Sequence, residues 1–446
     1  MPELNAFTEK QIDLSGGALL SFLLAMGALA VTTGVLAGIY PALFLSAFQP
    51  VAVLKATKSS SSSGGALRKV LVVFQFAISV FLIVGTITVY LQLDYVQNKN
   101  LGFDRDLMLM MPLFGVDRSL TAQHNTVLDT FLRHPNILKA TGSHSTMGYG
   151  GQLDQVFPEG FPETDFQWRV VGTDEHFLDT YGIELVAGRN FDPSNVSDTT
   201  RAFILNETAV RTLGWDDPDV SAALGKEFGW NAANRNDGGR VIGVVKDFHN
   251  RALHEEIRPV VIAMWLAKLN QMSLKIRGED IEETIAYAED TWRQFIPEKP
   301  PWHYFLDETI EGMYRQEMRV GTMANLFSGL AILIACMGLV GMASYTTEQR
   351  TKEIGIRKSM GASGNSIVVL VSREFVTLVA VANVIAIPAA WHAMRDWLNA
   401  FHYRIDLGAG IFLAGVVISV SVAMLTVSYH AIRASGVDPV EALHHE

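Results

Sequence analysis

Five long runs without a charged side chain constrain this chain of 446 residues more than any other feature. A run of 18 or more such residues is long enough to cross a bilayer as a helix. The fourth run is the weakest because it has only 17 residues and contains Pro388. One such run also fits a buried core helix, but five in one chain predict a membrane protein. The runs are Gly17–Ser46, Val70–Leu93, Gly321–Thr347, Phe375–Trp391 and Leu407–Tyr429.

The loops between the runs predict an orientation, because short cytoplasmic loops are rich in Lys and Arg. Loop 49–69 holds four basic residues and no acid, and loop 348–374 holds five bases against three acids. Placing both inside leaves an aromatic group, Trp391, Trp397, Phe401 and Tyr403, at the outer membrane interface. The predicted order is an extracytoplasmic segment 1–16, a transmembrane helix 17–48, a cytoplasmic Ser/Gly-rich linker 49–69, a transmembrane helix 70–93, an extracytoplasmic domain 94–318, a transmembrane helix with its stalk 319–347, a cytoplasmic loop 348–374, a transmembrane helix 375–391, an extracytoplasmic loop 392–406, a transmembrane helix 407–430 and a cytoplasmic tail 431–446.

Residues 94–318 read as an α+β domain, because short apolar strand patterns mix with helical ones. Asp280 is expected to cap the last of these helices, and Pro297 to stop it. The stretch 309–320 is expected to run into the third apolar run as one continuous helix. Strands are predicted at 106–114, 168–173, 201–206, 240–245, 259–265 and 272–278, and helices at 119–133, 175–181, 207–213 and 280–295.

The charge and chemistry of this domain exclude several function classes. It carries 35 Asp and Glu against 21 Lys and Arg, which argues against nucleic-acid binding. Its seven histidines show no metal-ligand spacing, and no catalytic constellation is visible. The lone Cys336 excludes an internal disulfide. No phosphate-binding loop is present, since the Gly225-Lys226 pair is followed by Glu227. The histidines are His124, His134, His144, His176, His249, His254 and His303.

An internal echo relates residues 40–56 to residues 429–445. Each segment follows a predicted outside-to-inside run, so both resemble the exit of the last helix in a repeated unit. One full unit of helix, outer domain and three helices would then follow the final helix of another, and we expect the rest of that second unit upstream or on a second chain. At an offset of 389, the identical pairs are Tyr40 and Tyr429, Ala42 and Ala431, Ser46 and Ser435, Pro50 and Pro439, Val51 and Val440, and Leu54 and Leu443.

The charged insert after the third run, "EQRTKEIGIRKSMGAS" (348–363), can form a short helix. Glu353 and Arg357 are four residues apart in the favourable order for a side-chain pair. Gly361 suits a helix C-terminus, and Ser363 can cap the next helix. Ile354 and Met360 would give a small apolar contact surface. The residues alone fit a solvated basic loop and a docking element equally well.

Residues 313–363 resemble the permease subunits of the MacB/FtsX family of ABC transporters, in which this type of insert is characteristic. The stretches 170–191, 203–215 and 241–250 resemble the family's periplasmic core domain, and the two echo segments resemble its half-ends. The resemblance therefore covers nearly the whole chain and is closest to long permeases with two units.

The resemblance implies an α-helical membrane protein of about five transmembrane helices with an inserted α+β domain, in a bacterial inner membrane. It implies a non-catalytic permease subunit, with no cofactor on this chain and with ATP and Mg²⁺ bound by a separate cytoplasmic ATPase. Work would be delivered to an extracytoplasmic protein, lipid or peptide by mechanotransmission, and a second permease unit or copy is expected. The ATPase-coupling role falls on Glu348, Arg350, Glu353, Ile354, Gly355, Arg357, Lys358, Met360, Gly361 and Ala362.

Two other interpretations remain open at this point. The chain can be a membrane sensor or scaffold whose acidic outer domain binds a ligand or a cell-wall enzyme. An enzyme on the outer side is a weaker alternative, because the sequence shows no catalytic arrangement.

Overall fold

The computed structural model describes residues 17–46, 62–113, 122–148, 150–161, 166–230, 235–251, 255–349, 353, 356–357 and 359–435. The chain divides into two compact units. The first unit contains Met1–Gln75, Met337–Val379 and Thr426–Glu446, and the second contains Phe76–Cys336 and Ala380–Leu425.

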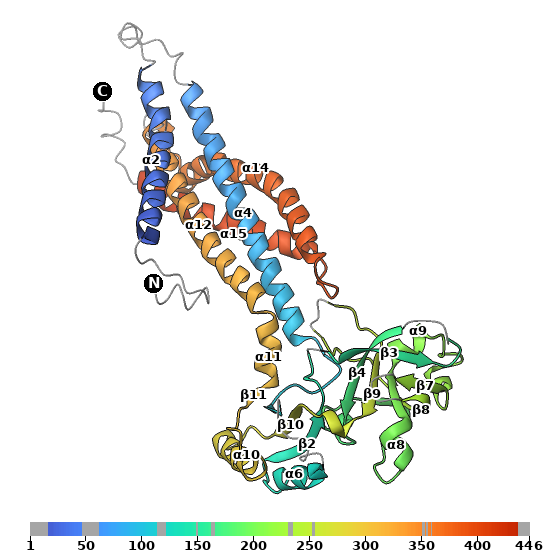
Figure 1. Cartoon of the computed structure of the whole chain (residues 1–446). Helices are drawn as coiled ribbons and strands as arrows, with labels where there is room; N and C mark the ends of the chain where they lie inside the picture. Colours follow the sequence, from blue (N-terminus) through green and yellow to red (C-terminus); the bar gives the residue numbers. More distant parts are fainter. Residues whose placement is uncertain are drawn as a thin grey trace. The chain divides into compact units, whose positions relative to one another are not determined.

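Five long helices carry the five apolar runs (Figure 1). Within the described residues, four helices are long and apolar enough to cross a membrane, namely Ala66–Asn98, Glu317–Gln349, Val368–Leu398 and Ala409–Tyr429. The first run contributes a shorter apolar stretch, Leu19–Val35, so a fifth span is not confirmed. The long helices are α2 (Gly17–Ser46), α4 (Ser62–Asn98), α12 (Arg315–Gln349), α14 (Gly364–Leu398) and α15 (Ala409–Ser435).

The weakest run proves to lie in a full-length helix. Helix α14 has 35 residues and continues through Pro388. Membrane helices tolerate an internal proline because neighbouring groups satisfy the freed backbone carbonyl. The candidate span therefore extends well beyond the 17 residues of the apolar run on both sides.

Between α4 and α12 the chain forms an eleven-stranded mixed sheet. The strands follow the order β11-β1-β10-β2-β4-β3-β7-β8-β6-β9, and β5 pairs with β8. Strand β9 also pairs in parallel with β4. The pairings β4-β3-β7-β8-β6-β9 therefore close into a ring. The strands are β1 (Met108–Pro112), β2 (Ile137–Ser143), β3 (Gln152–Pro158), β4 (Phe166–Thr173), β5 (Leu185–Gly188), β6 (Ala202–Asn206), β7 (Glu227–Trp230), β8 (Arg235–Val245), β9 (Val260–Met264), β10 (Gln271–Ile276) and β11 (Tyr304–Phe305).

Strands that are apolar throughout lie where both faces of the sheet are covered. In β1, Met108 and Met110 enter one hydrophobic cluster, whereas Leu109 and Met111 enter another. Strand β9 divides in the same way, and all five of its residues are buried. Period-two alternation is absent from such strands because neither face meets water.

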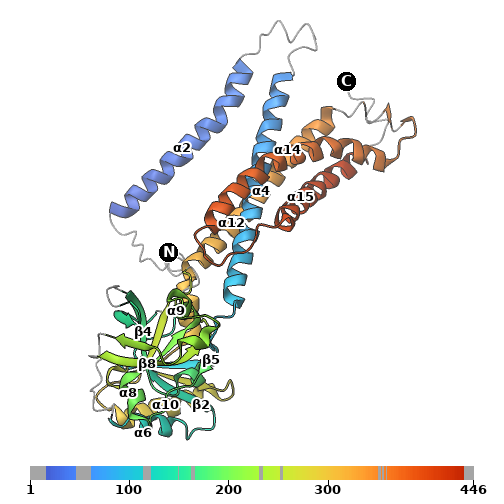
Figure 2. The same cartoon turned by 90° about the vertical axis from the view of Figure 1, so that its right-hand side faces the viewer.

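Short helices complete the domain. Helices α6 and α10 pack against each other and close the cluster beneath β1 and β10 (Figure 2). Trp292 of α10 and Phe131 of α6 are almost fully buried there. The remaining elements are α6 (His124–Phe131), α7 (Phe177–Thr180), α8 (Val196–Arg201), α9 (Glu207–Thr212), η1 (Val220–Ala223), η3 (Leu266–Lys268), α10 (Ile281–Phe295) and α11 (Leu306–Met313).

The prediction of one continuous helix from 309 into the third run is wrong. Tyr314, with φ −106° and ψ 8°, separates α11 from α12. Its buried side chain belongs to the main cluster of the sheet domain, so packing of this ring fixes a turn in the backbone.

Asp280 directly precedes α10, in the predicted N-cap position. Asp280 lies at φ 49°, in the left-handed region, and its side chain makes no capping hydrogen bond. Its carbonyl instead accepts hydrogen bonds from the backbone N–H and the hydroxyl of Thr284, both at 3.0 Å.

Gly188 offers a test of this architecture, because a Cβ there would lie 2.2 Å from the Ile242 carbonyl oxygen. We expect Gly188→Ala to destabilise the sheet domain by more than about 3 kcal/mol, through the sum of a clash and a positive φ. Gly160 has a similar positive φ with open space around it, so Gly160→Ala should cost only about 1 kcal/mol. Thermal unfolding of the detergent-solubilised chain measures both, and equal losses would contradict the assigned β5–β8 contact.

Candidate functional site

The charged insert lies in the first unit, between α12 and α14. Met360 N–H donates to the Ile356 carbonyl at 3.1 Å, as in a helical turn. A guanidinium nitrogen of Arg357 lies 2.7 Å from a carboxylate oxygen of Glu353, which confirms the predicted side-chain pair. Exposed pairs of this kind stabilise a helix by only about 0.3–0.5 kcal/mol, so this pair contributes little to the stability of the turn.

The insert ends in a defined helix stop. Gly361 has φ +91°, and Ala362 N–H donates to the Arg357 carbonyl at 2.9 Å. This is the six-to-one hydrogen bond of a Schellman motif with glycine in the left-handed position. Ser363 then accepts from Ser366 N–H at the start of α14, through its hydroxyl at 3.4 Å. The predicted C-terminal glycine and N-terminal serine cap are therefore both present.

Two apolar side chains of the insert face outward. Ile356 is 49% exposed and Met360 is 76% exposed, and their spacing of four places them on one side of a helical turn. Ile356 was missing from the predicted site, although the same spacing in the sequence points to it. Glu348 and Glu353 are also exposed, whereas Arg357 and Ala362 are half-buried. The predicted residues Arg350, Ile354, Gly355 and Lys358 lie outside the described residues.

The helices that flank the insert are held to α4. The Arg68 guanidinium lies 3.9 Å above the Tyr345 ring of α12, and Lys69 Nζ lies 2.5 Å from Glu374 of α14. A Cβ on Gly338 would approach Gln75 Oε1 to 2.5 Å, so α12 packs closely on α4 there. The basic residues of the predicted linker thus make specific contacts as well as contributing charge.

A buried glutamine organises the loop between α14 and α15 in the second unit. Gln92 of α4 donates to the Tyr403 carbonyl and accepts from Ile405 N–H, both at 2.9 Å. Because both amide functions are used, the pair of bonds fixes the position of this loop against α4. We call this pair of bonds the Gln92 clamp.

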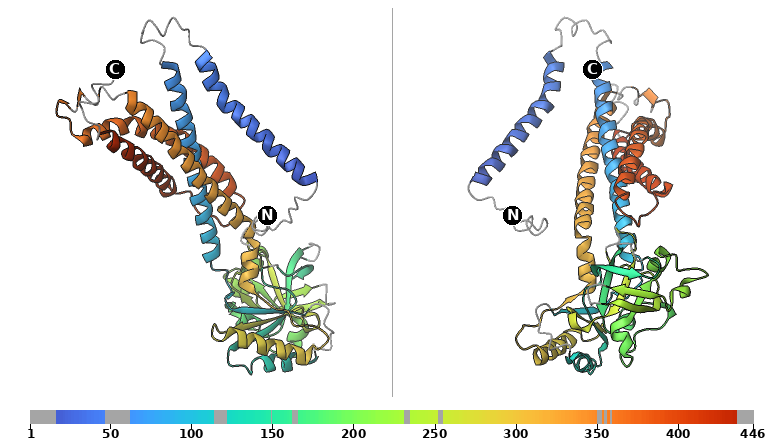
Figure 3. Two further views of the ribbon diagram at one scale, coloured as in Figure 1. Left: turned by 90° about the vertical axis from the view of Figure 1, so that its left-hand side faces the viewer. Right: turned by 45° about the vertical axis from the view of Figure 1, so that its right-hand side comes forward.

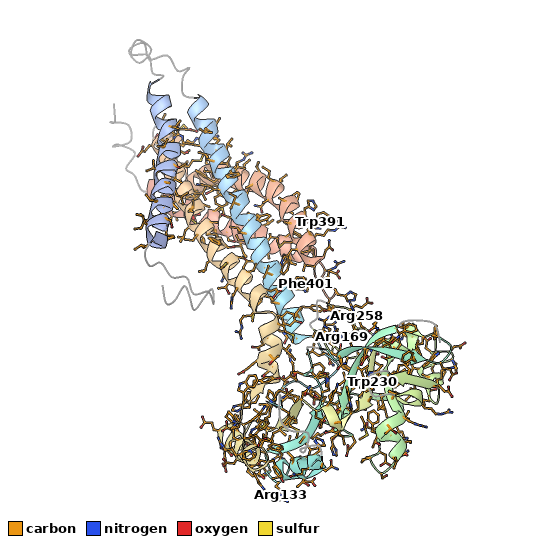
Figure 4. The ribbon with its side chains drawn as sticks, in the orientation of Figure 1. Arg133, Arg169, Trp230, Arg258, Trp391 and Phe401 are labelled. Carbon is orange, nitrogen blue, oxygen red and sulfur yellow. The ribbon has the colours of Figure 1, made fainter. Side chains whose placement is uncertain are left out.

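Tyr403 connects the same loop to the sheet domain. Its ring lies edge-on to His249 with centroids 4.8 Å apart, and Lys99 Nζ lies 4.3 Å from its centroid. Phe401, labelled in Figure 4, is buried. Its ring packs on Trp397. Phe401 and Tyr403 contact protein, while Trp391 is 43% exposed, and the membrane-interface belt stays a prediction.

Among the described residues, no group of three or more His, Cys, Asp or Glu is arranged to hold a metal ion. The first unit offers an exposed apolar pair, Ile356 and Met360, and the second unit offers the contacts that link its long helices to the sheet domain.

The His249–Tyr403 contact predicts a pH dependence of stability. Burial lowers the pKa of His249 from 6.5 to about 4, with a further contribution from Lys99, while Asp247 opposes the shift. The folded chain therefore keeps this imidazole neutral where the unfolded chain binds a proton, and stability falls as pH decreases from about 6.5 to about 4. We expect a loss of about 2 kcal/mol over this range and a flatter profile in His249→Phe.

Thermal unfolding between pH 4 and pH 7 measures the effect. His402→Phe is the matched control, since exposed His402 contacts the same tyrosine ring with centroids 4.8 Å apart. Equal flattening in both variants would show that His249 is not the group responsible.

The chain is similar in sequence to ABC transporter permeases and in structure to one of their periplasmic domains. It is 19% identical over 351 residues to the uncharacterized ABC transporter permease YknZ of Bacillus subtilis, covering 74% of this chain and 83% of the relative. It is 23% identical over 299 residues to the macrolide export ATP-binding/permease protein MacB of Neisseria gonorrhoeae, covering 64% of this chain but only 44% of that protein. The solved periplasmic region of MacB from Actinobacillus actinomycetemcomitans matches 49% of this chain and 97% of that structure, with a TM-score of 0.34 and 14% identity.

Two family models match separate parts of the chain. The MacB-like periplasmic core domain matches residues 70–290, and the FtsX-like permease C-terminal domain matches residues 325–439. The first range contains most of the sheet domain, and the second contains the insert, α14 and α15. The chain belongs to the MacB/FtsX-type family of ABC transporter permeases.

Proposed function

We propose that this chain is a non-catalytic permease subunit that couples a separate cytoplasmic ABC ATPase to movement of its extracytoplasmic domain. The observation that carries the proposal is the exposed pair Ile356 and Met360 on a capped helical turn between two membrane-length helices. An apolar pair among charged residues is the pattern of a helix that docks in a groove of a partner. The surrounding residues from Glu348 to Ala362 would set the orientation of this docking.

The proposed mechanism uses ATP and Mg²⁺ on the partner ATPase. Closure of an ATPase dimer would displace the docked insert, and α12 and α14 would carry this displacement along the membrane normal. Because α4 and α12 lead directly into the sheet domain, that domain would move with them. The work would be delivered to an extracytoplasmic protein, lipid or peptide, in a bacterial inner membrane and together with a second permease unit or copy.

A charge placed on the docking surface tests the ATPase contact. We expect Met360→Glu to lower co-purification with the partner ATPase at least tenfold, because the variant places an unpaired carboxylate in an apolar contact. Val196→Glu is the matched control, since Val196 is 78% exposed in the sheet domain. ABC ATPases of the same genome, each co-expressed with the chain, supply the partner.

An ATPase that remains bound to Met360→Glu and to a 353–360 deletion alike would overturn the coupling assignment. The sensor or scaffold alternative predicts a different result, in which inactivation of the ATPase leaves the phenotype of the chain unchanged.

The proposed orientation has a separate test. In a Cys336→Ser background, Ser194→Cys should react with a membrane-impermeant maleimide on intact spheroplasts. Ser359→Cys should react only after permeabilisation, because the insert is proposed to face the cytoplasm. Both serines are exposed, so burial does not protect either of them. The reverse pattern of labelling would invert the topology.

A further inference from the structure

A groove of about 690 Å³ lies between α4 and the start of α15, within the second unit. Its size falls in the range of about 300–1,000 Å³ that is typical of small-molecule sites. Its walls extend along α4 from Ile87 to Lys99, which is about 18 Å at 1.5 Å per residue. That length is comparable to one leaflet of a bilayer, whose whole hydrocarbon core is about 30 Å thick.

The groove is apolar toward the middle of the helices. Ile87 and Leu91 of α4 line it on one side, and Ile411 and Ala414 of α15 line it on the other. Leu91 is 38% exposed, so the groove is open along this part. Small side chains, namely Gly410 and Ala414, keep space where α15 passes α4.

The groove is charged toward the sheet domain. Asp94 and Asp406 line this end with exposed carboxylates, and Lys99 supplies one ammonium group. Asp94 accepts a hydrogen bond from Asn98 at 3.0 Å. The Asp406 carboxylate makes no side-chain hydrogen bond or ion pair within the described part of the chain.

Lys99 is held in place by aromatic groups. Its Nζ donates to the Tyr95 hydroxyl at 3.2 Å and lies over the Tyr403 ring. One of its three N–H groups is used by Tyr95, so the others can meet an anionic oxygen. The charged end of the groove is thus lined by two carboxylates and one lysine ammonium group.

We propose that this groove binds a phospholipid with a primary ammonium head group, that is, a phosphoethanolamine lipid. An acyl chain fits the apolar part, the phosphate meets Lys99, and the ammonium donates to Asp94 and Asp406. Two carboxylates against one lysine favour a zwitterionic head over an anionic one, and carboxylate acceptors favour a primary ammonium over a quaternary one, which has no N–H to donate. The inference rests on α4 and α15 crossing the membrane, and not on the proposed coupling to an ATPase.

The location of the groove predicts an effect of the bound lipid on the loop between α14 and α15. The head group would lie beside Ile405 and Lys99, next to the Gln92 clamp and the Tyr403–His249 contact. A bound lipid would therefore stabilise the loop that ties α14 and α15 to the sheet domain.

Native mass spectrometry of the full chain in detergent tests the proposal, because it reports bound lipids and the number of chains together. Palmitoyl-oleoyl phosphatidylethanolamine, phosphatidylglycerol and phosphatidylcholine are added at equal concentration. We expect the wild-type chain to retain the ethanolamine lipid. Asp94→Asn with Asp406→Asn should lower that retention at least fivefold, as should Ala414→Phe, which fills the apolar part.

The matched control removes two other exposed carboxylates, through Asp106→Asn with Asp396→Asn. Retention that falls equally in the groove variant and in this control would overturn the site, as would retention that does not fall in either. Equal wild-type binding of all three lipids would show annular lipid only. A change in chain number without retained lipid would show that a second copy of the chain occupies the groove. Each of these outcomes is read without an ATPase, so failure here is separate from failure of the proposed coupling.

Discussion

A helix that crosses a bilayer must satisfy all its backbone hydrogen bonds internally, and the rest of this structure depends on that requirement. The apolar runs accordingly form helices, and these helices are longer than the runs. Helix α4 ends at Asn98 and helix α12 begins at Arg315, both within the range 94–318 predicted for the extracytoplasmic domain. The loop that carries Tyr403 is held against α4 by the Gln92 clamp, and the insert ends in a cap at Gly361.

Glycine and small polar residues then determine how these helices associate. A Cβ on Gly321 would lie 3.1 Å from Val89, and one on Gly415 would lie 2.8 Å from Val84, so α4 is closely packed against α12 and against α15 (Figure 3). The hydroxyls of Thr86 and Ser328 add a hydrogen bond of 2.9 Å between α4 and α12. Such contacts replace the hydrophobic effect, which is weak between helices in lipid.

The sequence predicts those strands and helix caps that depend on a local pattern or on burial of the whole strand. The strands β1, β6 and β9 are apolar throughout because cores cover both of their faces, and all three were predicted. Strands β3 and β7 mix polar and apolar residues, and β11 has two residues, so only their pairing partners identify them. The Glu353–Arg357 pair, Gly361 and Ser363 were predictable for the same reason, since each acts within one or two helical turns. The Gln92 clamp joins residues more than 300 positions apart, so no local sequence pattern predicts it.

Helix α4 makes side-chain contacts with other elements near both of its ends. Near its start α4 contacts α12 and α14 through Arg68 and Lys69, and near its end it holds the outer loop through Gln92. Tyr314 separates α11 from α12, and its buried ring packs in the main cluster of the sheet domain, so the start of α12 is anchored to that domain.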